Sequence, residues 1–145
     1  MTELITTVVI TVSSILLFGY WFRYSCLLML STKTARDYVG AVAAANQLGI
    51  LEVQSRLRAG SPELDRLRES LDRDYAVLTR LLTGSAESGM EEWMLGINYR
   101  FMGAWYRVSS RFSPAAARQA LEEMSMIVAH FANTMGERAA SAAAA

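Results

Sequence analysis

The chain has 145 residues, with 14 Lys plus Arg, 14 Asp plus Glu and a formal net charge of zero. Zero net charge argues against a nucleic-acid partner, because proteins that bind phosphate backbones carry a basic surplus. A single cysteine, Cys26, excludes an internal disulfide framework, and a single histidine, His130, excludes any site that needs two imidazoles from one chain.

Charge is unevenly distributed along the chain. Charged residues make up 19% of the sequence, whereas soluble domains average about 25%. The shortfall lies at the N-terminus, where Glu3 and Arg23 are the only charged residues before Lys33. The sequence therefore predicts three segments: an apolar anchor over 1–32, a domain over 33–136 and an Ala-rich flexible tail over 137–145.

The anchor is predicted to span a membrane. Residues Leu4 to Phe22 are uncharged and mostly aliphatic, and at about 1.5 Å per residue they reach roughly 28 Å, close to the hydrocarbon thickness of a bilayer. Their hydroxyl groups can bond to carbonyls of the preceding turn. Tyr20, Trp21 and Tyr24 form an interfacial aromatic belt at one end, and Arg23 can reach the headgroups from there.

Two features of the anchor leave alternatives. An apolar run follows Arg23, so a shifted register would place Arg23 inside the bilayer and require a carboxylate on another chain. A cleavable signal peptide is disfavoured, because no basic segment precedes the run and no Ala-x-Ala follows it. Arg23, Lys33 and Arg36 lie on the C-terminal side, so we expect the N-terminus outside and the domain in the cytoplasm. Cys26 is expected to be an apolar filler.

The domain is predicted to be all-α, an antiparallel bundle of three to four helices into which the single transmembrane helix continues. No segment alternates with period two, and each proline follows a serine, the pattern of an N-cap with proline in the first turn. Gly60, Gly84 and Gly136 are the expected C-terminal stops. The predicted helices are 33–58, continuous with the span, then 62–83, 90–112 and 114–135.

The second and fourth predicted helices each have one apolar face. That face comprises Leu64, Leu67, Leu71, Tyr75, Leu78 and Leu82 in the second, and Ala117, Leu121, Met124, Val128, Phe131 and Met135 in the fourth. The remaining surface of the second helix, from Arg66 to Asp74, alternates in charge and is expected to be solvated. Small residues between Gly40 and Ala45 indicate that the first helix crosses another inside the bundle.

The third helix is apolar over most of its circumference. One arc holds Trp93, Met94, Ile97, Phe101, Trp105, Val108 and Phe112, and a second holds Leu95, Tyr99, Met102 and Tyr106. Such a helix is either surrounded by its own bundle or a contact surface. We take Trp93, Ile97, Tyr99, Phe101, Met102, Trp105, Tyr106 and Phe112, with the ridge Arg100, Arg107 and Arg111, as the candidate partner or lipid interface. The arginines could pair with Asp65, Glu69 or Asp72, or with lipid phosphates.

No catalytic constellation is found. The acidic pairs at 91–92 and 122–123 lack the Glu-x-x-His motif of di-iron bundles. Met126 and His130 fall on the polar side of their helix, so a solvated histidine is favoured over haem or copper ligation with Met124. Neither a nucleophile elbow nor a Gly-rich phosphate loop is present. We therefore expect no enzyme activity, cofactor, metal or small-molecule substrate.

These observations favour a membrane-anchored accessory, assembly or scaffold subunit of a larger membrane complex, whose partners are the bilayer and either other subunits or further copies of the chain. The alternative is a peripheral module in which the Arg- and aromatic-rich helix lies on the membrane surface. A third possibility is a small haem or copper carrier.

Overall fold

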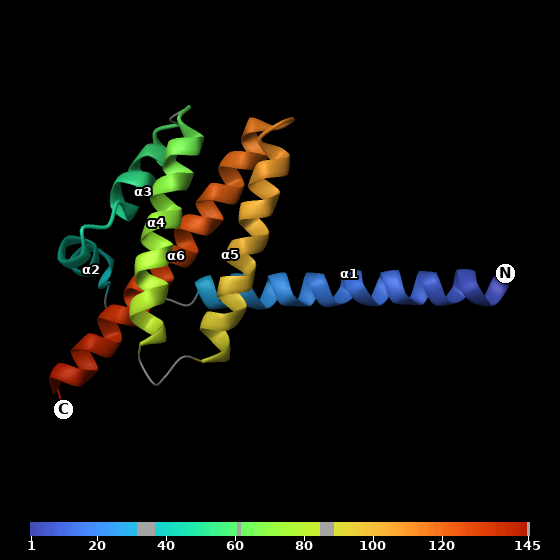
Figure 1. Ribbon diagram of the computed structural model, residues 1–145, viewed down its shortest axis with the longest axis horizontal. Coiled ribbons are helices and arrows are strands. Elements are labelled where there is room, and N and C mark those ends of the chain that lie inside the picture. Colours follow the sequence, from blue (N-terminus) through green and yellow to red (C-terminus); the bar gives the residue numbers. More distant parts are fainter. Residues whose placement is uncertain (32–36, 61, 85–88, 145) are drawn as a thin grey trace. The chain divides into compact units, whose positions relative to one another are not determined.

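The computed structural model describes residues 1–31, 37–60, 62–84 and 89–144. Every regular element in these ranges is an α-helix, which confirms the all-α prediction (Figure 1). The chain divides into two compact units, Met1–Thr32 and Lys33–Ala145. This division agrees with the composition boundary at residue 32.

The first unit is the single helix α1, Thr2–Ser31. It is long and apolar enough to cross a membrane, with a mean hydropathy of 1.9. The hydroxyls of Thr6, Thr7 and Thr11 each donate to the carbonyl four residues earlier, at 2.8 to 2.9 Å. These bonds satisfy the hydroxyls within the helix, as a spanning segment requires. Tyr20 and Tyr24 stack with ring centroids 6.3 Å apart.

The predicted helix over 33–58 is wrong, because two short helices take its place. These are α2, Val39–Asn46, and α3, Ile50–Arg58. The chain turns at Gln47, whose φ of 55° lies in the left-handed region. Asp37 and Tyr38 are not helical, so the expected continuation from the anchor to Arg58 also fails, while 32–36 lie outside the described residues.

The break between α2 and α3 is stabilised from another helix. Asp74 of α4, Leu64–Thr83, is 3% exposed and accepts the backbone N–H groups of Gly49 and Ile50 at the start of α3. A carboxyl oxygen there accepts helix N–H groups that have no intrahelical acceptor. Asp74 therefore belongs to the interior, and the prediction that the whole charged surface of this helix is solvated is wrong.

The last two helices are α5, Met90–Ser109, and α6, Pro114–Ala144. Ser113 caps α6 as predicted, with its Oγ accepting the N–H of Ala116 at 3.3 Å. The other serine-proline pair behaves differently, because α4 begins at Leu64 with Glu63 as N-cap, and Ser61 lies outside the described residues. The predicted end of the last helix at Met135 is wrong, since α6 runs through the Ala-rich segment, whose alanines favour a helix.

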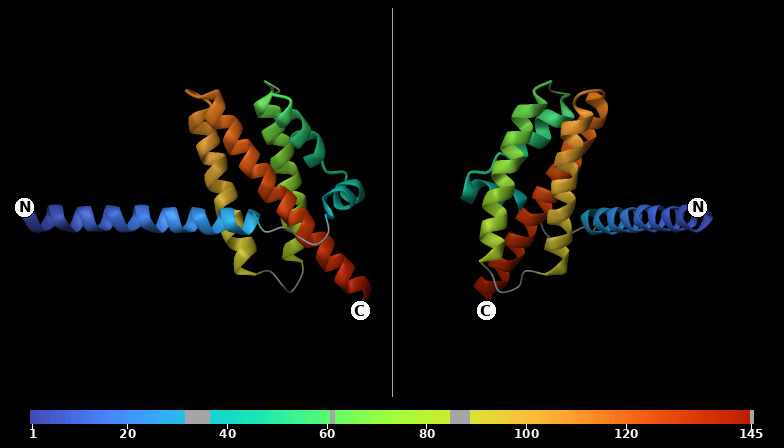
Figure 2. Two further views of the ribbon diagram at one scale, coloured as in Figure 1. Left: turned by 180° about the vertical axis from the view of Figure 1, so that it is seen from behind. Right: turned by 45° about the vertical axis from the view of Figure 1, so that its right-hand side comes forward.

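Helix α6 is the centre of the second unit and packs against α2, α3, α4 and α5 (Figures 1 and 2). Its buried residues cover far more than the single face predicted, and many of them are small: Ala117, Ala120, Leu121, Glu123, Met124, Ser125, Ile127, Val128, Phe131, Ala132 and Gly136. Small side chains let neighbouring helices approach closely on several sides.

Gly136 shows this close approach most clearly. A Cβ added there would lie 2.6 Å from Cγ of Tyr38, which is too close for two carbon atoms that are not bonded to each other. Beside it, the side-chain Oδ1 of Asn133 accepts the backbone N–H of Tyr38 at 2.8 Å. Gly136 therefore seats the chain entering α2 on α6, and it is not the helix stop that the sequence predicts.

Candidate functional site

Helix α5 has one buried and one exposed apolar face. Leu95, Tyr99, Met102 and Tyr106 are at most 5% exposed, so the three of them predicted as interface residues, Tyr99, Met102 and Tyr106, belong to the bundle core. The other arc is exposed and is called the α5 apolar face below. It comprises Trp93 (64% exposed), Ile97 (38%), Phe101 (57%), Trp105 (43%), Val108 (50%) and, just after the helix end, Phe112 (67%).

The buried face of α5 connects to α4 through its tyrosines. The hydroxyl of Tyr99 donates to Asp72 Oδ1 at 2.7 Å, and that of Tyr106 donates to Asp65 Oδ1 at 2.5 Å. The ring of Tyr99 also stacks on Tyr75 of α4, with centroids 3.9 Å apart and planes 5° from parallel. These contacts fix the rotation of α5 about its axis, because both hydroxyls need acceptors when buried.

Burial and the neighbouring carboxylates change how these tyrosines titrate. Burial, and then the bond to Asp65, raises the pKa of Tyr106 to about 12. Burial, and then the bond to Asp72, raises the pKa of Tyr99 well above its ordinary value. Both phenols therefore stay protonated, and remain donors, throughout the physiological range.

The arginines of α5 do not pair with the acids of α4 as predicted. Asp65 and Asp72 accept the tyrosine hydroxyls instead, and Asp72 also lies 3.6 Å from Nε of Arg68 on its own helix. In the described part of the chain, no carboxylate lies within ion-pair distance of Arg100, Arg107 or Arg111. All three are exposed. The predicted ridge therefore presents uncompensated positive charge beside the α5 apolar face.

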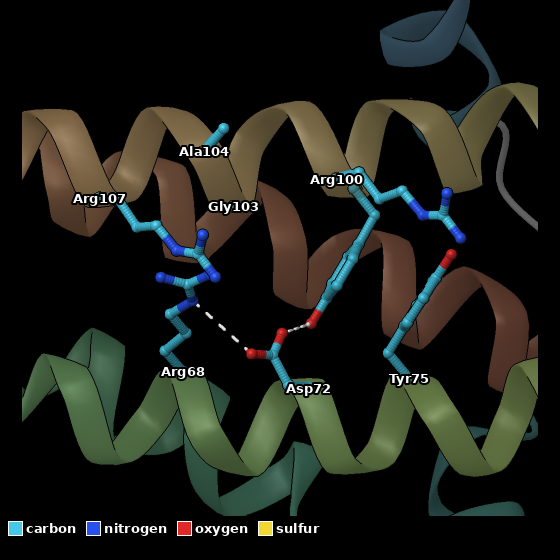
Figure 3. Close-up of a pocket in the computed structure, with 8 residues that line it drawn as sticks. Arg68, Asp72, Tyr75, Arg100, Gly103, Ala104 and Arg107 are labelled. Atoms are coloured by element: carbon cyan, nitrogen blue, oxygen red, sulfur yellow. Dashed lines mark hydrogen bonds and ion pairs between the residues drawn. The ribbon is translucent and has the colours of Figure 1, made fainter.

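Two cavities lie between α4 and α5 and together form what we call the α4–α5 groove. The smaller, about 290 Å³, is lined by Arg68, Asp72, Tyr75, Tyr99, Arg100, Gly103, Ala104 and Arg107 (Figure 3). The larger, about 840 Å³, is lined by Tyr75, Thr79, Leu82, Thr83, Gly89, Met90, Glu92, Trp93, Gly96, Ile97, Arg100 and Phe131. Because Tyr75 and Arg100 line both cavities, the two cavities adjoin. The end lined by Arg68 and Arg107 is cationic, and the other end is mainly apolar.

Arg68 and Tyr75 were not recognised as site residues in the sequence. Arg68 is placed on the solvated surface there, yet its side chain is only 17% exposed and its guanidinium lies 5.1 Å from the ring centre of Tyr106. Tyr75 is placed in the core stripe, although it also faces the groove. The available signal was the spacing of Arg68, Asp72 and Tyr75, which puts them on one flank of the leucine face.

Three glutamates of the acidic pairs contact partners within their own helix or on a neighbouring helix. Glu92 accepts the N–H of Gly89 at the start of α5 at 2.5 Å and pairs with Arg138. Glu91 lies 3.1 Å from Nε2 of His130, whose side chain is 17% exposed, so the predicted solvated histidine is wrong. Glu123 is 7% exposed and accepts the side-chain amide of Asn98 at 3.2 Å.

The candidate soft-metal ligands do not converge with further ligands. Met124 is fully buried, whereas Met126 is 45% exposed. Within the ranges that the structure covers, no group of three or more His, Cys, Asp or Glu residues is placed to hold a metal ion.

Known proteins provide no further guide to this site. No protein-family model, curated protein or solved structure matches the chain.

Proposed function

We propose that the chain is a bitopic membrane protein that acts as an accessory, assembly or scaffold subunit, with α1 as the anchor and the α5 apolar face as the surface that binds another subunit. The observation that carries the proposal is the exposure of six large apolar residues along one side of α5. Exposed apolar residues that gather on one side of a helix are typical of a contact site.

Covering this face would contribute substantially to a contact. Fully burying one exposed large apolar side chain contributes about 1.5 to 3 kcal/mol, and these six are 38% to 67% exposed, so the whole face supplies about 5 to 9 kcal/mol before the cost of association. That cost is about 4 to 15 kcal/mol. A partner must therefore cover most of the face, and a membrane anchor helps by confining both proteins to one bilayer.

Site-specific photocrosslinking in the native membrane tests the proposal. A photoreactive residue at Phe101, in the middle of the α5 apolar face, is expected to give one discrete adduct. The matched control is the same residue at Glu69, which is exposed on α4, and which should give none. An adduct of twice the chain mass would identify a second copy as the partner. A chain that purifies as a lone monomer, with no adduct from Phe101, refutes the proposal.

We propose the same bilayer orientation as the sequence predicts, with the N-terminus outside and the bundle in the cytoplasm. The support is the placement of Arg23, Lys33 and Arg36 after the apolar run. Labelling of single cysteines at Thr2 and Ser141 in intact cells, in a Cys26→Ser background, tests it. An impermeant maleimide should react at residue 2 and not at residue 141, and the reverse pattern would contradict it.

A second candidate function is a membrane-surface module. It is favoured by the exposed Trp105 beside Arg100, Arg107 and Arg111, since aromatic residues flanked by arginines suit the headgroup layer. The bundle without residues 1–32 should then bind anionic liposomes at low salt and lose binding when the three arginines become serine. Absence of binding at low salt would remove this candidate.

A further inference from the structure

The cationic end of the α4–α5 groove is built to receive a negative charge. Arg68 and Arg107 extend toward one another from α4 and α5, and Arg100 lies further along the same cavity near Tyr75 (Figure 3). Asp72 is the only carboxylate among the described residues that line this cavity. It already accepts the hydroxyl of Tyr99 at 2.7 Å and pairs with Arg68 at 3.6 Å.

Asp72 therefore compensates at most one of the three guanidinium groups. Arg107 lies beside Arg68 with no further carboxylate among the described lining residues, so an anion would relieve the repulsion between these two guanidinium groups (Figure 3). Guanidinium groups bind carboxylate and phosphate oxygens through paired N–H donors, which gives them both affinity and a defined orientation. The chemistry at this end of the groove is that of a headgroup carrying carboxylate or phosphate.

The adjoining end of the groove is suited to hydrocarbon. Its cavity of about 840 Å³ is walled by Leu82, Trp93, Ile97 and Phe131, and this size lies within the usual range of small-molecule sites, about 300 to 1,000 Å³. Glu92 is the only carboxylate among its described lining residues. Because Glu92 is engaged by Arg138 and by the N–H of Gly89, it does not oppose an apolar occupant.

Arg100 and Tyr75 join the two ends, so the charge of an occupant must lie directly beside its apolar part. We propose that the α4–α5 groove binds a single-chain anionic amphiphile, with its carboxylate or phosphate at Arg68 and Arg107, Arg100 at the junction, and its hydrocarbon chain between Leu82, Trp93 and Phe131. The ligand is bound without being chemically changed. This inference goes beyond the proposed function, and the two surfaces share Trp93 and Ile97, so the test uses the chain without a protein partner.

The two tryptophans of α5 allow a direct test, because Trp93 lines the groove whereas Trp105 does not. Two single-tryptophan forms of the full chain are reconstituted in phosphatidylcholine nanodiscs: Trp21→Phe with Trp105→Phe, which keeps Trp93, and Trp21→Phe with Trp93→Phe, which keeps Trp105. Brominated stearic acid is added, since bromine quenches tryptophan fluorescence only on contact. Quenching should be saturable at Trp93 and absent at Trp105 over the same range.

Headgroup chemistry is tested with matched probes and variants. Brominated lysophosphatidic acid should also quench Trp93. Brominated stearyl alcohol lacks a charged headgroup that accepts hydrogen bonds from arginine, so half-maximal quenching should need at least about tenfold more of it. Arg100→Gln with Arg107→Gln should weaken the anionic probes by a similar factor. Arg111→Gln is the control, because Arg111 is also exposed but lines neither cavity. Competition by inorganic phosphate shows whether the headgroup alone binds.

Each contrary result overturns the proposal. Equal quenching of Trp93 and Trp105 would mean that α5 lies against the bilayer and that no groove site operates. Equal binding of the alcohol and the acid, or no effect of the double arginine variant, would mean that hydrocarbon enters without charge recognition. No quenching at all would mean that the groove takes no amphiphile. Unchanged thermal unfolding of the arginine variants confirms that the bundle is intact.

Discussion

Replacing Gly136 by alanine separates two opposing effects on the stability of the bundle. Intrinsic propensity favours the substitution, since alanine is better than glycine within a helix by about 1 kcal/mol. Packing opposes it, because the added Cβ would lie 2.6 Å from Cγ of Tyr38. Tyr38 is also held by its backbone N–H, which donates to Asn133 Oδ1 at 2.8 Å, so it cannot move away without losing that bond.

The packing term is the larger of the two. Forcing an extra carbon into a filled contact costs about 1 to 3 kcal/mol, and this contact lies at the severe end because the obstructing atoms are next to the Tyr38 backbone. Losing the bond to Asn133 adds about 1 kcal/mol. We therefore expect Gly136→Ala to lower the free energy of unfolding by about 2 to 3 kcal/mol after the gain in propensity.

Gly40 provides the matched control. It lies in α2, and a Cβ added there meets no atom within 4 Å, so Gly40→Ala should gain the propensity term alone and stabilise by about 0.5 to 1 kcal/mol. Thermal unfolding of the full chain in nonionic detergent, followed by circular dichroism, measures both variants, since α1 stays helical in the micelle and contributes a constant signal. Gly136→Ala should lower the midpoint by several degrees. A midpoint raised as much as by Gly40→Ala would refute the close approach.

Three further predictions concern the polar groups of the interior. Burial raises the pKa of Asp74, so ionisation of this carboxyl opposes folding once the pH exceeds the pKa of the unfolded chain, near 3.9. Relative to the parent chain, Asp74→Asn should therefore gain stability as the pH rises from about 4 to 7. Denaturant unfolding at both pH values measures this difference in stability, which would stay constant if the carboxyl were solvated. Burial raises the pKa of Tyr106 to about 12, so its protonated phenol stabilises the fold below about pH 10, and that contribution is lost as the pH rises through 12. Tyr106→Phe should remove a late step from the tyrosinate absorbance titration. An unchanged titration would contradict the buried bond to Asp65. Tyr99→Phe deprives Asp72 of a donor at 2.7 Å and should cost about 1 to 2 kcal/mol. Tyr75→Phe also keeps the stacked ring pair and should cost clearly less, and equal losses in denaturant unfolding would contradict a specific contribution from the bond to Asp72.

Helix starts and helix faces followed from the sequence where the signal is local. Ser113 and Pro114 begin α6 because a cap and a fixed φ act within one turn. The break at Gln47 is different, because Asp74, distant in the chain, takes the N–H groups that start α3. A tertiary contact of this kind overrides a continuous helical pattern, and no local residue announces it.

Gly136 illustrates a second limit of sequence reasoning. Glycine near the end of a helical pattern indicates a C-terminal stop when only local conformation is considered. Here its value is the absence of a side chain beneath Tyr38, and the alanines that follow continue α6 to Ala144. The central position of α6 has the same origin, since its small residues gain their meaning only when four neighbouring helices pack around them.

The candidate site was partly predictable for a related reason. Periodicity identified α5 as apolar on two arcs, but it does not say which of the two arcs faces the bundle. The choice is made by Asp65 and Asp72 of α4, which accept the hydroxyls of Tyr106 and Tyr99. The same pairing leaves Arg100 and Arg107 without the acidic partners expected for them, and this creates the cationic end of the groove.

The rotation of α5 places its more hydrophobic arc outward. Tyr99 and Tyr106 are buried with their hydroxyls bonded, while Phe101 and Val108 are at least half exposed. A domain that folds only for its own stability gains by burying the phenyl and aliphatic groups and exposing the tyrosines, which can bond to water. The opposite arrangement forgoes apolar burial along the length of a helix. It is physically reasonable if the α5 apolar face is covered when the protein is assembled in its membrane, and that is the condition which the crosslinking at Phe101 examines.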